Sequence, residues 1–344
     1  MKGRGAADNP PNRFERIALE RDPDWTEEDP APGTLLYKDH AREILASNDS
    51  PDIPFSWSLN PYRGCEHGCS YCYARPNHEY LGLSAGLDFE TKLFVKEDAP
   101  ALLRKALSAK SWEPAPVCLS GVTDAYQPVE RKLELTRRCL EVFADCLNPV
   151  MIITKSRLVA RDADLLGRLA KVNAASVCLS ITTLDEELRR TLEPRASSPR
   201  DRLAAVRTLA DAGVPVGVMA APVIPGLTDH ELPAILEAAK KAGAGFAGYI
   251  MLRLPYGVAD LFSDWLERNA PGRKKKVLSQ LSGERGGRLN DPRFGSRMRG
   301  QGPFAAMLKA AYSAACRKHG LKTRGPELSA ESFKRPVGPQ LELF

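Results

Sequence analysis

Three cysteines, Cys65, Cys69 and Cys72, lie within eight residues of one another. Cysteine thiolates are the usual protein ligands of iron–sulfur clusters, and three of them bind three irons of a four-iron cubane, leaving the fourth iron open to a small chelating ligand. Gly64 and Gly68 permit the tight backbone that wrapping one cluster requires. The spacing therefore predicts a [4Fe–4S] cluster with these three cysteines as metal ligands.

Two other metal sites are compatible with the same residues. A zinc site needs a fourth Cys or His; His67 lies inside the loop, where it does not easily complete a tetrahedron, and His78 is the alternative fourth ligand. A non-enzymatic iron–sulfur protein, for electron transfer or structural support, is the other interpretation. Both remain open at this point.

The composition favours a globular protein. The chain has 344 residues, of which 43% are apolar, which suits one large domain or two smaller ones. No run approaches the roughly 18 apolar residues of a membrane span, and residues 1–29 lack the apolar core of a secretion signal. Eight cysteines are too few for a disulfide scaffold of this length. We therefore expect a soluble, cytoplasmic protein in a reducing compartment, with no membrane partner.

Short apolar runs alternate with segments of helical periodicity from about residue 58 onward. After a first strand just before Cys65, the runs predict strands at 117–122, 150–154, 176–182, 214–221 and 246–252. Helices are predicted at 99–109, 133–146, 163–172, 200–212 and 232–242. Such alternation is typical of right-handed βαβ units with a parallel sheet, whose sites form at the carboxyl ends of the strands.

These elements predict an α/β fold with three parts. Six βα repeats over residues 58–270 indicate a partial (β/α)6 barrel, since a closed eightfold barrel needs more strands. Residues 1–57 are rich in Pro, Asp and Arg in their first part. They are expected to form a disordered N-terminal arm and a segment that leads into the barrel. Residues 271–344 are expected to form a basic C-terminal extension with a helix.

The basic residues are concentrated near the C-terminus. Between positions 268 and 299, ten Lys and Arg residues stand against two acids, a net charge of +8, whereas the whole chain carries +6. Such a segment attracts phosphates, although a solvated basic loop has the same composition. Arg293, Arg297 and Arg299, interleaved with Phe294, are the candidate substrate-binding residues.

The chain resembles the radical S-adenosylmethionine (SAM) superfamily, whose signature is the Cys-x3-Cys-x2-Cys spacing with an aromatic residue, here Tyr71, before the last cysteine. Within it, the chain resembles the spore photoproduct lyase-related, or DNA repair photolyase-like, branch. The resemblance covers roughly residues 58–320. It rests on ordered motifs: Asn60-Pro61-Tyr62-Arg63-Gly64-Cys65, Cys72-Tyr73, Thr123-Asp124, Thr154-Lys155, Ser180-Ile181, Glu193-Pro194, Arg202-Leu203-Ala204-Ala205 and Ala221-Pro222.

The resemblance implies a radical reaction. The open iron binds the amino and carboxylate groups of SAM, and one electron from the reduced cluster gives methionine and a 5′-deoxyadenosyl radical that abstracts hydrogen from a substrate. A low-potential donor such as flavodoxin or ferredoxin is expected to supply the electron. The basic segment favours a nucleic acid or nucleotide as substrate, in a lyase-like or transferase reaction; a protein or small molecule is the alternative.

The resemblance also implies roles for particular side chains. The expected SAM contacts are Tyr71, Thr123, Asp124, Lys155, Ser180 and Ala221. Lys155 ends its strand and can pair with a carboxylate, whereas Ser180 offers a hydroxyl. Tyr73 is the candidate catalytic residue, either relaying a hydrogen atom or packing beneath the cluster.

One position departs from the family pattern. The spore enzyme returns hydrogen from a cysteine that precedes the hydroxyl pair and aspartate of the second strand, and Gly121 stands there in this chain. Cys118 does not substitute for it, because side chains alternate along a strand and positions 118 and 121 face opposite sides. This difference argues against spore-type lesion repair and leaves the radical chemistry intact.

Overall fold

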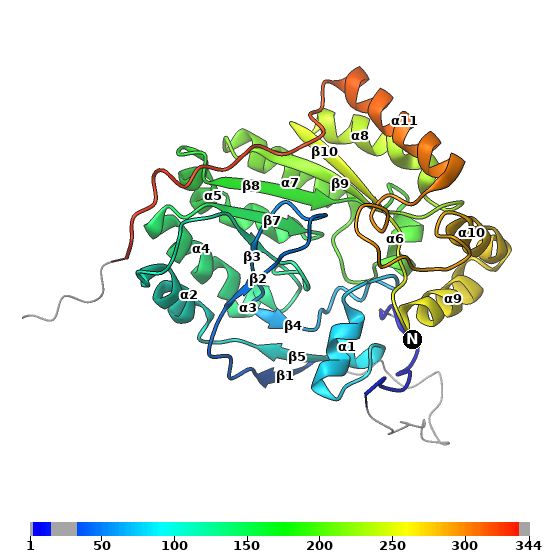
Figure 1. Cartoon of the computed structure of the whole chain (residues 1–344), viewed down its shortest axis with the longest axis horizontal. Helices are drawn as coiled ribbons and strands as arrows, with labels where there is room; N and C mark the ends of the chain where they lie inside the picture. The colour runs from blue at the N-terminus through cyan, green and yellow to red at the C-terminus, as the bar shows by residue number, and fades with distance from the viewer. Residues whose placement is uncertain (1–2, 15–32, 337–344) are drawn as a thin grey trace, which may run out of the picture.

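A seven-stranded sheet forms the centre of the computed structural model, which describes residues 3–14 and 33–336 (Figure 1). Its strand order is β10-β9-β8-β7-β6-β3-β2. Six strands are parallel: β3 (Trp57–Leu59), β6 (Val117–Leu119), β7 (Val150–Thr154), β8 (Ala175–Ser180), β9 (Val216–Val223) and β10 (Phe246–Met251). The antiparallel strand β2 (Leu45–Ser47) forms one edge. Because β10 and β2 are both edges of the described sheet, the predicted partial barrel of six βα repeats is confirmed.

Helices connect the successive parallel strands and cover the sheet (Figure 1). They are α2 (Ala99–Ser108), α3 (Glu130–Leu133), α4 (Leu135–Cys146), α5 (Ala163–Ala170), α6 (Glu186–Leu192), α7 (Pro199–Asp211) and α8 (Leu232–Lys241). Each predicted helix is present within a few residues of its expected bounds. Their apolar faces bury side chains against the sheet, as Leu140 and Phe143 of α4 do.

The remaining elements flank this core. A small sheet has the order β1-β5-β4, from β1 (Leu35–Lys38), β5 (Lys92–Val95) and β4 (Tyr62–Arg63). The others are α1 (Leu87–Thr91), α9 (Val258–Asn269), α10 (Pro271–Gly283), α11 (Gly302–His319) and the 3-10 helices Arg75–Leu81, Arg157–Asp162 and Asp229–Glu231. Helix α11 lies beside α8 (Figure 1), and its Tyr312 hydroxyl donates to the Ala247 carbonyl at 2.7 Å. Within residues 3–14 and 33–336, no helix is long and apolar enough to cross a membrane.

A second, smaller core joins helix α9 to the segment of residues 64–72 that carries the three cysteines, here called the cysteine loop. Phe262 and Trp265 of α9 are buried in one apolar cluster with Cys69, Tyr71 and Leu192. Burial of this aromatic surface against the loop stabilises the loop's backbone position.

Strand β6 is shorter than predicted. It ends at Leu119, whereas the apolar run predicted a strand to residue 122. Ser120 has φ +82°, a left-handed conformation that no strand accommodates. The next three amides, of Gly121, Val122 and Thr123, donate to the Asn60 side-chain oxygen at 3.0–3.3 Å instead of a neighbouring strand.

The expectation of a disordered N-terminal arm is wrong for residues 3–14. The backbone amides of Gly5 and Ala6 donate to the buried Glu90 carboxylate at 3.1 and 2.8 Å. Gly5 approaches the cysteine loop so closely that a Cβ there would lie 1.7 Å from the Gly68 oxygen. A buried acceptor thus orders this polar segment. Residues 15–32 of the expected arm lie outside the described residues.

Candidate active site

The cysteine loop faces the carboxyl ends of the parallel strands. Two chains of hydrogen bonds connect the loop to these strand ends, one through Asp124 after β6 and one through Glu193 after α6. Sequence-predicted residues lie along both chains, since Lys155 directly follows β7, Ser180 ends β8 and Ala221 lies in β9.

Glycines and a glutamine shape the cysteine loop. Gly64 and Gly68 have φ values of +79° and +65°, a region that glycine enters without steric cost. The Gln127 side chain accepts from the Glu66 amide at 2.8 Å and donates to the Gly64 carbonyl at 3.2 Å. The loop conformation is therefore fixed by its own backbone and by a buried amide from the segment after β6.

A buried ion pair holds the middle of the loop. The Arg75 guanidinium donates to the Cys69 carbonyl through Nε at 3.1 Å and Nη2 at 2.9 Å, and it pairs with Glu90 at 2.5 Å. A Cβ on Gly68 would lie 2.7 Å from the same Glu90 carboxylate, which explains the glycine there. Both charged side chains are fully buried, so each depends on the other for a partner.

The donor set fits an iron–sulfur cluster. Cys65 and Cys69 are buried, Cys72 is half-buried, and all three are free thiols. Burial raises the pKa of the Cys65 thiol, and the proximity of Asp124 and of the two other thiols raises it further. Bound iron offsets that cost by supplying positive charge to the thiolates. In the described part of the chain, no three Cys, His, Asp or Glu side chains converge on one ion; a cubane does not need this, because each cysteine binds its own iron.

Asp124 connects the loop to the ends of β6 and β7. Its carboxylate lies 3.3 Å from His67 Nδ1, accepts from the Lys155 amide at 2.8 Å and accepts from the Thr154 hydroxyl at 2.7 Å. Burial opposes ionisation, but His67 and these hydrogen bonds lower the pKa of Asp124 to about 2. The ionised carboxylate thus positions the loop and strand β7. Thr123 donates its hydroxyl to the Tyr62 carbonyl at 3.2 Å.

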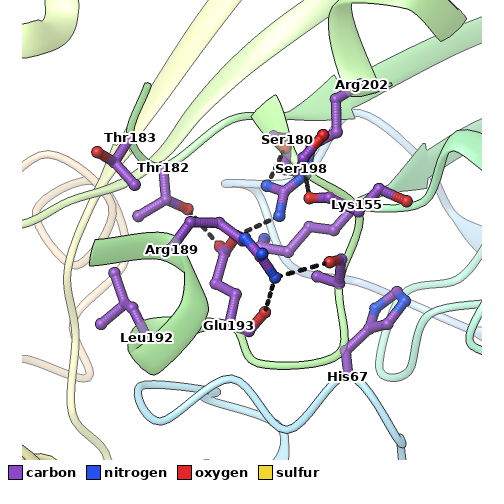
Figure 2. Close-up of polar contacts among 12 residues, drawn as sticks. His67, Lys155, Ser180, Thr182, Thr183, Arg189, Leu192, Glu193, Ser198 and Arg202 are labelled. Atoms are coloured by element: carbon purple, nitrogen blue, oxygen red, sulfur yellow. Dashed lines mark hydrogen bonds and ion pairs between the residues drawn. The ribbon is translucent and has the colours of Figure 1, made fainter. Parts of the chain in front are cut away.

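Glu193 is the centre of the second chain of hydrogen bonds (Figure 2). Its buried carboxylate accepts from the Arg202 guanidinium and the Tyr71 hydroxyl, and the Thr182 hydroxyl lies 2.7 Å away. Burial opposes ionisation, but the charges of Arg202 and Lys155 lower the pKa of Glu193 to about 2. A permanent negative charge therefore lies between the cysteine loop and the end of β8.

This network reaches three predicted cofactor-binding residues. Arg202 donates to the Ser180 carbonyl at 2.8 Å, and the Thr182 hydroxyl lies 2.8 Å from the Ala221 carbonyl. The Lys155 ammonium lies 5.8 Å from the centroid of the Tyr71 ring, and Figure 2 shows Lys155 extending toward Glu193. The structure thus brings the predicted Tyr71, Lys155, Ser180 and Ala221 to one region. Their contacts with SAM stay predictions.

Tyr73 extends from the last cysteine toward the loop after β6. Its hydroxyl donates to the Gly121 carbonyl at 2.8 Å, and the Arg253 guanidinium lies 4.6 Å from its ring centroid. The residue is 47% exposed. The side chain therefore contacts the loop after β6 and a residue after β10, and its catalytic role stays a prediction.

The three predicted substrate arginines lie apart from both chains of hydrogen bonds. Arg293 pairs with Asp291 at 2.9 Å, Arg297 pairs with Asp52 at 2.7 Å, and Arg299 donates to the Tyr249 carbonyl at 2.7 Å. All three belong to the segment between α10 and α11. Arg297 is nevertheless close enough to Arg253 to affect its charge: burial lowers the pKa of Arg253, and the charge of Arg297 lowers it further.

Sequence reasoning missed the side chains that organise the site. Glu193 and Arg202 occur in the motifs that carry the resemblance but received no role there. Arg75, Glu90 and Gln127 were not singled out. The partner of a buried charged side chain can be identified only once the fold is known. The sequence alone therefore did not predict these contacts.

Comparison with known proteins assigns the family. The Radical SAM superfamily matches residues 59–239, more than half of the chain, so the chain belongs to this superfamily. An uncharacterized protein of Mycobacterium tuberculosis is 38% identical over 221 residues, which cover 64% of this chain and 65% of that protein. An uncharacterized protein of Methanocaldococcus jannaschii is 31% identical over 214 residues, covering 62% and 76%. The matched region thus spans just under two thirds of the mycobacterial relative.

A solved structure shares the fold. Spore photoproduct lyase complexed with dinucleoside spore photoproduct superimposes with a TM-score of 0.58 at 17% identity, covering 83% of this chain and 79% of that one. The chain therefore shares the fold of that lyase. Its cofactors are those of the family, a [4Fe–4S] cluster and SAM.

Proposed function

We propose that Cys65, Cys69 and Cys72 hold the cluster and that the enzyme abstracts hydrogen from a nucleic acid or a nucleotide. When bound, the cluster supplies the electron that cleaves SAM into methionine and a 5′-deoxyadenosyl radical. The observation that carries the proposal is the connection of the cysteine loop to the strand ends through Asp124 and Glu193. Those two carboxylates fix the loop where Lys155 and Ser180 also converge.

The chain's own residues bind and orient the cofactor. Lys155, which lies beside the negative Glu193, is proposed to pair with the carboxylate of SAM, and Ser180 to contact the ribose. The second core, including Phe262 and Trp265, excludes water from the loop, which protects a reactive intermediate from quenching.

The proposed substrate class is supported by two aromatic rings, each of which has an arginine guanidinium against it. Arg253 lies over the Tyr73 ring, and Arg297 lies 4.6 Å from the Phe294 ring centroid. Aromatic platforms with adjacent arginines bind bases and phosphates together. We also propose a reducing cytoplasmic location and a low-potential flavodoxin or ferredoxin as donor, because a thiolate-bound cluster requires both reduced thiols and an electron source.

Anaerobic reconstitution with iron and sulfide tests the proposal. We expect a four-iron cluster in the wild type and in Cys316→Ser, a buried cysteine of α11, and loss of the cluster in Cys72→Ser. Dithionite and SAM should then yield 5′-deoxyadenosine. An intact cluster without that product refutes the assignment.

Isotope transfer tests the substrate. Deuterated DNA, RNA and nucleotides should transfer deuterium into 5′-deoxyadenosine, and analysis of the products then separates a lyase from a transferase reaction. Transfer from peptides or metabolites alone would favour the alternative substrate class.

A further inference from the structure

The segment of residues 285–301, here called the strap, is bound along one edge of the sheet. Met251 at the end of β10 donates its amide to the Met298 carbonyl at 3.0 Å, and Arg285 donates to the Leu252 carbonyl at 2.5 Å. Figure 1 shows this orange segment between the ends of β9 and β10 and helix α10. The strap therefore starts from the β10 edge of the open sheet.

Residues of the strap next to Met298 also bind the connection that follows β2, the other edge strand. Asp52, in the connection between β2 and β3, accepts from the Gly295 amide at 2.7 Å through Oδ1 and from Arg297 Nε at 2.7 Å through Oδ2. Arg297 also donates to the Ser50 hydroxyl. Because β10 and β2 are the two edges of the described sheet, the strap links the end of one edge strand to the connection that follows the other.

The groups that hold Asp52 form an oxyanion site. A backbone amide in a left-handed turn, with Gly295 at φ +83°, and a guanidinium are the donors that bind phosphate oxygens. The carboxylate occupies both donors, and its side chain is only 10% exposed. Asp52 thus takes the place that an external anion with two oxygens would take.

A surface hollow lies directly beside this site. It is shallow and open to solvent, and it is lined by Arg293, Phe294, Gly295, Ser296, Gly300 and Gln301. Phe294 is 58% exposed and has the Arg297 guanidinium against its ring. An aromatic face next to an oxyanion site suits a base attached to its phosphate.

We propose that the strap carries a phosphate-binding site which Asp52 occupies in the substrate-free chain, and that a phosphate of a nucleotide or nucleic acid displaces Asp52 from Gly295 and Arg297. Displacement releases the connection between β2 and β3 from the strap and seats the adjoining base on Phe294. The identity of the substrate in this inference rests on the proposed function. The competition between Asp52 and phosphate rests only on the contacts of Asp52 with Gly295 and Arg297.

Binding of a fluorescein-labelled single-stranded oligonucleotide, followed by anisotropy on the reconstituted enzyme, tests the competition. Asp52→Asn should tighten binding about 10-fold, a typical coupling between competing groups, and Arg297→Gln should weaken it by a similar factor. Asp49→Asn is the matched control, because Asp49 is exposed in the same connection and carries the same charge. Arg293→Gln, which loses a pair with Asp291 instead, should have a smaller effect than Arg297→Gln.

Equal affinities of Asp52→Asn and Asp49→Asn would overturn the proposal. Hydrogen exchange of residues 48–56 gives a second measurement. Pyrophosphate replaces Asp52 as the acceptor of the Gly295 amide, so it should leave that amide protected and accelerate exchange at Asn48 and Ile53 in the released connection; no change there would also overturn the proposal. SAM cleavage by dithionite separates the two hypotheses. If cleavage is intact and pyrophosphate accelerates exchange in residues 48–56 but no oligonucleotide binds, the nucleic-acid substrate is refuted while the phosphate site is supported.

Discussion

Replacing Glu193 by glutamine should destabilise the enzyme strongly. The change leaves the Arg202 guanidinium fully buried without a charged partner, and breaking one side of a buried pair costs about 3–5 kcal/mol. The pKa gives a consistent magnitude. Each unit of pKa corresponds to about 1.4 kcal/mol. Lowering the pKa of Glu193 from 4.5 to about 2 therefore corresponds to roughly 3 kcal/mol of stabilisation of the ionised carboxylate in the folded protein.

The sign of the pH dependence follows from the direction of this shift. Since the pKa of Glu193 is lower in the folded protein, its stabilisation is complete above pH 4.5 and is lost as the pH falls toward 2. Glu193→Gln should therefore show a flatter loss of stability over that acidic range than the wild type. Urea unfolding at a series of pH values measures both the offset and the slope.

Two further variants make the result decisive. Arg200→Met changes an exposed arginine at the start of the same helix, α7, and should cost less than about 0.5 kcal/mol. The double variant Glu193→Gln/Arg202→Met removes both charges and should be less destabilised than the sum of the single variants. A cost for Glu193→Gln no larger than that of Arg200→Met would refute the assignment of Glu193 as the centre of the network.

Three other changes probe neighbouring contacts. Glu90→Gln should cost about 3–5 kcal/mol, because it leaves Arg75 without its charged partner, and should shorten cluster retention in an iron-release assay. Asn60→Ala should cost about 1–3 kcal/mol by removing the acceptor of three amides, seen as faster hydrogen exchange at residues 121–123. Tyr73→Phe should keep 5′-deoxyadenosine formation; a fall in substrate product indicates a hydrogen-atom relay, and unchanged product indicates packing alone.

Local sequence patterns were sufficient to predict the partial barrel. The apolar run at β7 matches the observed strand Val150–Thr154 residue for residue, because a buried parallel strand needs only continuous apolar residues. The cysteine motif could be read in the same way, since Cys65, Cys69 and Cys72 lie within eight residues; their role as cluster ligands stays a prediction. In both cases the information is contained in a few neighbouring residues.

Long-range polar contacts were not predictable by the same reasoning. Glu90 binds the amides of Gly5 and Ala6, more than 80 residues away in sequence, and composition alone suggested that this polar segment would lack order. Asp52 and Arg297, 245 residues apart, carry no pattern that pairs them. Such contacts form only where the fold brings distant side chains together. The periodicity of a single sequence predicts helices and strands, but it does not predict which distant residues meet.

Gly121 shows where this enzyme diverges from its structural relative. A Cβ there would lie 3.5 Å from Ser58 Cβ and 4.0 Å from Phe55 Cζ, which are ordinary van der Waals distances. The structure therefore has room for a Cβ at this position, beside the Tyr73 hydroxyl that donates to the Gly121 carbonyl. Lack of room for a Cβ therefore does not explain the glycine, which is consistent with the prediction that this chain does not return hydrogen by the route of the spore enzyme.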